Sequence, residues 1–227
     1  MAPPGGHVPG YQYHQLEKEK RTIPSGIIRK YTALSYTWGT SRRNIPILVN
    51  GANLDITASL RDALRHLKNI QEQGDFPFYW WIDMICINQE DDSERGHQVG
   101  MMRHIFRDAR VVVAWLGGTN CDERGETFLQ YIQKVSQSTY PKALVELSDE
   151  VSDGCWALLG HPWWSRLWII QEVLVAREVM IACRDVIVSW AILRLFVRHL
   201  EVISPGLPNK MALNLTMLRD ENQIRLH

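Results

Sequence analysis

The sequence predicts an α/β fold in which helices flank a mainly parallel central sheet. Two strongly apolar runs, 78–87 and 111–116, have the length and the bulky side chains of strands that are buried on both faces. A helical pattern lies between them without any hairpin signal, which predicts a strand–helix–strand crossover and parallel pairing. Residues 31–37 alternate small or apolar with polar side chains and are followed by Gly39, so we expect a third strand of the same sheet there.

The predicted domain continues after this strand with a hairpin and a helix. Residues 45–56, IPILVNGANLDI, contain a strand and an Asn-Gly pair, which is a strong signal for a tight hairpin turn. A helix is expected from Thr57 onward, with Thr57 or Ser59 as the N-cap. Its apolar side chains recur at helical spacing and are Leu60, Ala63, Leu64 and Leu67.

The middle of the chain predicts two further helices. The apolar face of the crossover helix is defined by residues at i, i+3, i+7 and i+10, namely Val99, Met102, Phe106 and Ala109. Residues 119–153 are more polar, and we expect a helix around 126–136 followed by an irregular loop.

The C-terminal part predicts a helix, a small hairpin and a last helix. The segment 161–176 enters a helix whose apolar side is formed by Leu167, Ile170 and Leu174. Residues 178–190 predict two short strands around a tight turn at 184–185. The last helix is expected at 191–203, because a proline-containing segment follows it.

These elements predict one domain with two flanking segments. Residues 1–30 are expected to form an N-terminal extension whose Pro/Gly-rich start is flexible. The domain itself is expected to span 31–203. Residues 204–227 are interpreted as a C-terminal segment or as a linker to a further domain.

Composition excludes several classes of function. Hydrophobic residues make up 45% and charged residues 22% of the chain, which is ordinary for a globular protein. Lys+Arg and Asp+Glu both number 25, so no basic excess favours nucleic acid. No run approaches the roughly 20 apolar residues of a membrane span, and the N-terminus has no apolar core of a signal peptide.

The cysteines and histidines also predict a cytoplasmic protein without a metal site. The four cysteines form no Cys-x-x-Cys pair, and we expect reduced, structural thiols rather than a disulfide or a zinc site. The eight histidines are scattered, and no His-Glu-x-x-His motif is present. No cofactor is expected either, since P-loop and Gly-x-Gly-x-x-Gly motifs are absent.

Asp83 is the first candidate for a functional residue. It lies inside the predicted strand 78–87, where a buried carboxylate costs several kcal/mol unless it is paired or opens into a site. Ligands of parallel sheets bind beyond the carboxyl ends of the strands, and the polar loop 88–95 follows at such an end. The alternative is a structural Asp83 that caps its own loop or pairs with Arg95.

Glu172 is the second candidate. It lies among Trp168, Ile169, Ile170, Val173 and Leu174, and a carboxylate near aromatic surface is a frequent setting for catalysis. The alternative is a core ion pair.

Three segments together resemble the signature blocks of the fungal heterokaryon incompatibility (HET) domain. They are YTALSYTWG (31–39), WIDMICINQEDDSERGHQVGMMRHIFRDARVVVAWLGG (81–118) and PWWSRLWIIQEVLVAREV (162–179), and the resemblance covers about Tyr31 to Trp190. It implies a domain that triggers regulated cell death when non-self is sensed, with a possible receptor-type module in cis or in trans.

The same segments are distantly similar to Toll/interleukin-1-receptor (TIR) domains, which implies a TIR-like sheet. ALSY at 33–36 resembles the first TIR strand, and Ile82-Asp83 and Arg95-Gly96 resemble the strand end and helix start of plant TIR domains. SRLWIIQE at 165–172 is similar to the TIR motif Ser-x-Trp-Cys-x-x-Glu, with one extra residue after the serine and Ile in place of Cys. The resemblance implies a catalytic Glu172 and a binding role for Ser35, Tyr36, Trp38, Asp83, Arg95 and Trp168.

In enzymatic TIR domains this glutamate serves cleavage of the nicotinamide–ribose bond of NAD+, so the resemblance implies NAD+, or a related nucleotide, as a substrate. Nicotinamide leaves as a neutral molecule and needs no general acid, while a carboxylate can stabilise the oxocarbenium-like transition state. Trp38 or Trp168 would stack on a ring of the nucleotide. Two alternatives stay open: a non-catalytic signalling module that self-associates, and a nucleoside deoxyribosyltransferase-like activity. Self-association is expected for the enzyme as well.

Overall fold

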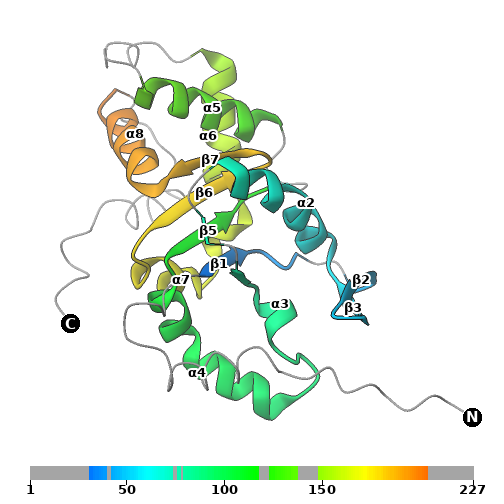
Figure 1. Ribbon diagram of the computed structural model, residues 1–227. Coiled ribbons are helices and arrows are strands. Elements are labelled where there is room, and N and C mark those ends of the chain that lie inside the picture. Colours follow the sequence, from blue (N-terminus) through cyan, green and yellow to red (C-terminus); the bar gives the residue numbers. More distant parts are fainter. Residues whose placement is uncertain are drawn as a thin grey trace, which may run out of the picture.

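The computed structural model describes residues 31–39, 42–73, 76–77, 79–117, 123–137 and 148–203, and the statements below refer to these ranges (Figure 1). The segments 1–30 and 204–227, interpreted above as an extension and a linker, lie outside the described residues. Within the described ranges no helix is long and apolar enough to cross a membrane.

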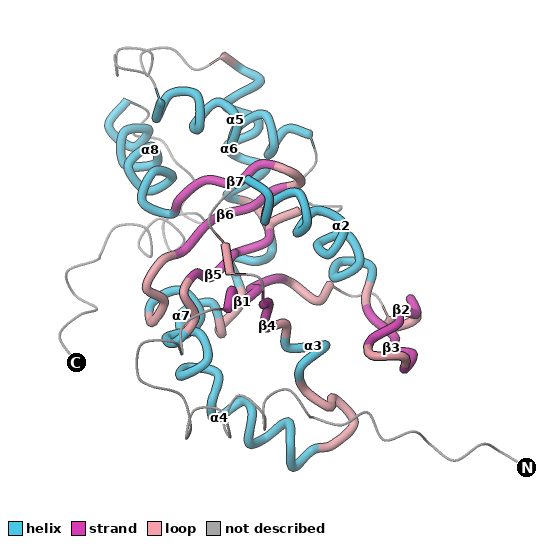
Figure 2. Tube along the Cα trace, in the orientation of Figure 1, coloured by secondary structure: helices cyan, strands magenta, loops and turns pink. Residues whose placement is uncertain are grey.

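A five-stranded, mainly parallel sheet forms the centre of the fold, as the sequence predicts (Figure 2). Strand β1 pairs in parallel with both β4 and β5, β5 pairs in parallel with β6, and β6 pairs antiparallel with β7. The strand order is β4 (Tyr79–Trp81), β1 (Tyr31–Tyr36), β5 (Val111–Trp115), β6 (Val179–Cys183) and β7 (Val186–Ser189). The three strands expected near 31–37, 79–86 and 111–116 are therefore neighbours in one sheet.

Helices cover both faces of this sheet, because successive strand residues point to opposite sides. On one face Leu34, Val113 and Trp115 pack in a cluster with Leu60, Ala63 and Ile70 of α2 (Ala58–Gln73). The opposite face, with Ala33, Val112 and Ala114, packs in a second cluster with residues from five further helices. These helices are α4 (Asp92–Asp108), α5 (Glu123–Gln137), α6 (Asp149–Leu159), α7 (Ile169–Leu174) and α8 (Trp190–Ile203).

The hairpin at 45–56 is confirmed as a separate two-stranded sheet of β2 (Ile45–Val49) and β3 (Ala52–Ile56). Its turn has Asn50 at φ 52° and Gly51 at φ 83°, the two positive φ values of a type I′ turn. The following helix is capped by Thr57, whose Oγ1 accepts a hydrogen bond from Leu60 N at 3.3 Å.

The predicted strand 78–87 is wrong beyond Trp81. Strand β4 covers only three residues, and a short helix, α3 (Asp83–Cys86), replaces the second half. Asp83 Oδ1 accepts a hydrogen bond from Met84 N at 2.7 Å, and this local bond favours a helical start over an extended chain. Since β4 is an edge strand, its early end leaves few ladder bonds unmade.

The crossover helix α4 is confirmed, but its buried face differs from the predicted one. Asp91 caps the helix by accepting hydrogen bonds from the backbone of Ser93 and Glu94. The face it turns to the sheet contains Met102 and Phe106, as expected, together with Gln98 and Ile105. Val99, expected in the core, is 37% exposed.

The helix expected within 161–176 consists of two pieces. A 3₁₀ helix, η2 (Pro162–Ser165), is separated from α7 by Arg166, whose backbone is extended at φ −75° and ψ 131°. This break shifts the helical phase, so Ile169, Glu172 and Val173 are buried. The predicted apolar side is wrong, because Leu167 is 85% and Ile170 is 47% exposed.

The remaining elements show one omission and one error. The helix around 126–136, the hairpin at 178–190 and the last helix are confirmed, whereas α6 lies partly in the expected loop. The expectation that all cysteines are reduced is wrong at Cys183, which is disulfide-bonded, while Cys86 and Cys155 are free thiols. The spacing of cysteines along a sequence does not show which sulfur atoms the fold brings together.

Candidate functional site

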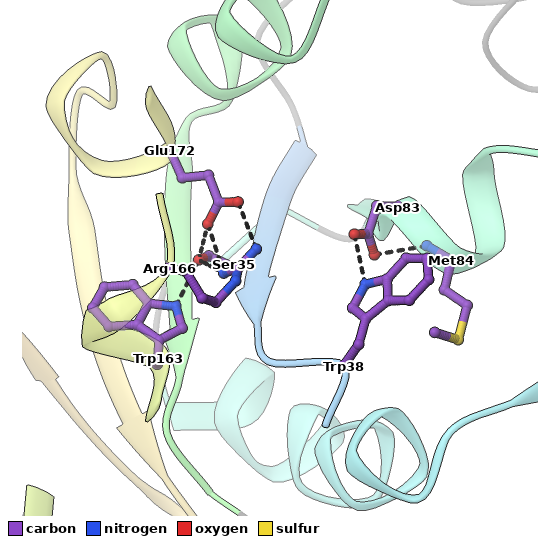
Figure 3. A network of polar contacts seen from close by, with 7 residues as sticks. All are labelled: Ser35, Trp38, Asp83, Met84, Trp163, Arg166 and Glu172. Atoms are coloured by element: carbon purple, nitrogen blue, oxygen red, sulfur yellow. Dashed lines mark hydrogen bonds and ion pairs between the residues drawn. The ribbon is translucent and has the colours of Figure 1, made fainter. Parts of the chain in front are cut away.

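A buried carboxylate, Glu172, contacts strand β1. Helix α7 places it against β1, where Ser35 Oγ donates a hydrogen bond to Glu172 Oε2 (Figure 3). Both residues are 1% exposed. Trp163 Nε1 in turn donates to Ser35 Oγ at 2.8 Å, so a buried indole fixes the serine hydroxyl. Ser35 lies one residue before the carboxyl end of β1, at the edge of a parallel sheet where ligands usually bind.

Arg166 neutralises this carboxylate. Its guanidinium donates from Nη1 to Oε2 at 3.0 Å and from Nη2 to Oε1 at 2.9 Å, which is a bidentate ion pair. Nη1 also lies 3.4 Å from Ser35 Oγ. The Arg166 side chain is 21% exposed and that of Glu172 is 2% exposed, so the arginine is the member of the pair that reaches solvent.

A second carboxyl group, Asp83, lies near the same end of β1. Trp38 Nε1 donates to Asp83 Oδ2 at 2.9 Å, and the Met84 amide binds Oδ1. Gln89 Nε2 donates to the backbone oxygen of Asp83 at 3.1 Å, which ties the following loop to this residue. Asp83 keeps partial contact with solvent, and within the described residues no Lys or Arg side chain pairs with it.

Several neighbouring groups act on the pKa of the Asp83 carboxyl group. Burial raises the pKa of its carboxyl group above the ordinary value, and the negative charge of Glu172 adds to this, while the hydrogen bonds from Trp38 and Met84 oppose it. Burial and the nearby Asp83 also raise the pKa of Tyr36. The Tyr36 hydroxyl has no partner at hydrogen-bond geometry among the described residues, although it is close enough to Asp83 for each to affect the other.

The two carboxyl groups flank the carboxyl end of β1. Ser35 and Tyr36 are successive strand residues and therefore point to opposite faces of the sheet. Glu172 binds Ser35, and Asp83 lies near Tyr36. One end of one strand thus brings together five of the predicted residues: Ser35, Tyr36, Trp38, Asp83 and Glu172.

Two predicted binding residues lie elsewhere. Arg95 is exposed on α4, where it pairs with Asp92 at 2.6 Å and donates to Gln89 O at 3.2 Å, so the alternative pairing with Asp83 is wrong. Trp168 precedes α7 and is 43% exposed, and it is Trp163 that binds Ser35.

Sequence reasoning missed Trp163 and Arg166. The one available signal is an arginine six residues before the buried glutamate, in a segment too broken to count as one helix. Among the described residues, no group of three or more His, Cys, Asp or Glu side chains is placed to hold a metal ion.

Comparison with known proteins gives a consistent result. The family model described as Heterokaryon incompatibility protein (HET) matches residues 31–172. Heterokaryon incompatibility protein 6, OR allele, of Neurospora crassa is 33% identical over 211 residues, covering 74% of this chain and 31% of the relative. Vegetative incompatibility protein HET-E-1 of Podospora anserina is 21% identical over 165 residues, covering 73% of this chain and 10% of the relative. No solved structure matches the chain significantly.

Proposed function

The chain belongs to the heterokaryon incompatibility (HET) family, and we propose that it is an effector domain of fungal incompatibility that causes cell death. Both relatives carry incompatibility in their names, which supports this role. The chain spans 31% and 10% of their lengths, so the remaining parts of such proteins would supply recognition of the trigger.

The activity that the site supports best is hydrolysis of NAD+ at the nicotinamide–ribose bond. The observation that carries it is the buried Glu172, which Ser35 holds at the carboxyl end of the parallel strand β1. A preorganised carboxylate stabilises the positive charge that develops on the ribose as nicotinamide leaves. The similarity of SRLWIIQE to the TIR motif supports the same assignment, and a TIR-like fold is part of this proposal.

A zwitterionic ligand is needed to open the site, because Arg166 occupies both oxygens of Glu172. Separating the pair without replacement leaves a buried charge alone, which is strongly unfavourable. NAD+ carries a pyridinium cation and a diphosphate. The diphosphate is a good bidentate partner for Arg166, and the cationic nicotinamide riboside half would take the place of the guanidinium beside Glu172.

The second candidate is a non-catalytic module that works by self-association. Two observations favour it. Glu172 is buried in an ion pair, and the nearby side chains of Leu167, Trp168 and Ile170 are apolar and exposed. These three residues are called the α7 patch below. A receptor-type module, in cis or in trans, would then bring copies together.

Nicotinamide release from NAD+ distinguishes the two candidates. The full 227-residue chain is assayed over a wide range of protein concentrations, next to Glu172→Gln. Glu150→Gln serves as the control, because Glu150 is exposed in the first turn of α6. Release by the wild type and the control but not by Glu172→Gln supports the hydrolase. Cell killing by all three proteins without release supports the self-associating module.

A further inference from the structure

The two carboxyl groups at the end of β1 differ in access and in charge balance. Glu172 is 1% exposed and neutralised by Arg166, whereas Asp83 is partly exposed and lacks a cationic partner within the described ranges. Of the two carboxyl groups, Asp83 is thus the one that belongs to a partly exposed residue and has no guanidinium bound to it within the described ranges. We propose that Asp83 is the general base that accepts a proton from the water attacking ribose C1′, a role that rests on the proposed cleavage of NAD+.

The carboxylate is oriented for such a role. Trp38 donates to Oδ2 at 2.9 Å and the Met84 amide donates to Oδ1 at 2.7 Å, so both oxygens are fixed from the protein side. A carboxylate offers about four acceptor sites, so each oxygen retains one for water. Trp38 is itself partly exposed and lies two residues after the end of β1. The hydrogen bonds that hold Asp83 therefore leave part of its acceptor capacity free.

The charged and titratable groups around Asp83 suit a base. The groups that act on it electrostatically are Tyr36 on β1, Glu172 on α7 and Cys86 on its own helix, and Arg166 acts in turn on Tyr36. Burial and the Glu172 charge raise the pKa of Asp83, which moves it toward the working pH, where a general base is most effective. Glu172 remains with Arg166 or with the cationic substrate, so the two carboxyl groups have different tasks.

The reaction balances without a further reactant. The C1′–N bond breaks, and its electron pair goes to the nicotinamide nitrogen, which becomes neutral. The water oxygen forms the new bond to C1′, and one water proton passes to the Asp83 carboxylate. Asp83 then releases this proton to solvent. The products are nicotinamide, ADP-ribose and one proton.

The alternative is that Asp83 only starts α3 and holds Trp38. Azide separates the two roles, because it attacks C1′ as an anion and has no proton to lose. If Asp83 is the base, Asp83→Asn should lower nicotinamide release by about 10²–10⁴-fold, the usual contribution of general acid–base catalysis. Sodium azide should restore release and yield azido-ADP-ribose, identified by mass spectrometry. A structural role predicts an impaired variant that azide does not restore.

The experiment uses the full chain as wild type, Asp83→Asn, Trp38→Phe and Asp92→Asn, the last as a control because the Asp92 side chain is 86% exposed. Wild-type release should fall as pH decreases through the pKa of Asp83, and this limb should vanish in Asp83→Asn. Trp38→Phe removes a hydrogen bond that lowers this pKa, so its limb should move to higher pH even if Asp83→Asn does not fold.

The outcomes distinguish the role of Asp83 as a base from the proposed cleavage of NAD+ on which it rests. A wild-type protein that releases no nicotinamide overturns NAD+ cleavage itself and Asp83 as its base. An active wild type with an Asp83→Asn variant that works at the control rate, or that azide fails to restore, overturns only the role of Asp83. A Trp38→Phe limb that stays in place has the same consequence.

Discussion

Removal of Arg166 tests whether the pair at the centre of the site is a tightly coupled unit. Arg166→Gln deletes two hydrogen bonds to Glu172 and a weaker one to Ser35, and it leaves a carboxylate that is 2% exposed without a cation. Breaking a buried pair on one side costs about 3–5 kcal/mol. Because the arginine is 21% exposed, we expect the lower end, about 3 kcal/mol.

The assay is urea unfolding of the full chain at constant pH and salt, as a double-mutant cycle. Arg166→Gln with Glu172→Gln leaves two neutral side chains, so the double variant should be more stable than Arg166→Gln alone. Arg95→Gln is the matched control, since its partner Asp92 is exposed and such surface pairs contribute about 0–1 kcal/mol. If Arg166→Gln costs no more stability than Arg95→Gln, or if adding Glu172→Gln restores none of it, Arg166 and Glu172 are not a tightly coupled pair.

Three further predictions concern packing, pH and assembly. Gly117→Ala should destabilise the fold by about 1–3 kcal/mol, because the added Cβ would overlap the indole ring of Trp115. Gly100→Ala in α4 meets open space and should stabilise the fold by up to about 1 kcal/mol. Thermal unfolding of both variants shows whether the two effects have opposite signs. The hydrogen bond to His66 holds the pKa of Asp185 below its ordinary value, so its contribution to stability is present above the pKa of the unfolded chain and is lost as pH falls through the lower pKa of the folded chain. In urea unfolding from neutral to acidic pH, Asp185→Asn should therefore lose less stability than the wild type. Equal losses would contradict this contribution of Asp185. Leu167→Glu, in the α7 patch, should shift sedimentation profiles toward monomer and remove any more-than-linear rise of activity with concentration, and unchanged profiles would count against assembly through the patch.

The sheet could be predicted from the sequence because its signals are local. Strands β1 and β5 are buried on both faces, and the Asn50-Gly51 pair and Thr57 determine the turn and the cap locally. The errors occur where one side chain changes the backbone course. Asp83 starts a helix inside an apolar run, and the extended backbone of Arg166 breaks the helix within 161–176.

The site could be predicted only in part, because its bonds join distant segments. Ser35 and Glu172 are separated by 137 residues. Glu172 was a candidate because of its apolar and aromatic neighbours, whereas only the resemblance to TIR motifs named Ser35 as a site residue. Arg166 and Trp163 were missed because nothing local shows which polar groups surround a buried carboxylate. Arg95 was expected to be a binding residue because of its place in a motif, yet on α4 it pairs with Asp92 at the surface.

The role of Glu172 in cleavage of the nicotinamide–ribose bond is decided by nicotinamide release from wild type and Glu172→Gln at equal protein concentration. Loss of one preorganised electrostatic contact lowers the rate by roughly 10²–10³-fold, so Glu172→Gln should lose activity by this factor while the chain still unfolds cooperatively. A folded Glu172→Gln protein that releases nicotinamide at the wild-type rate would rule this role out.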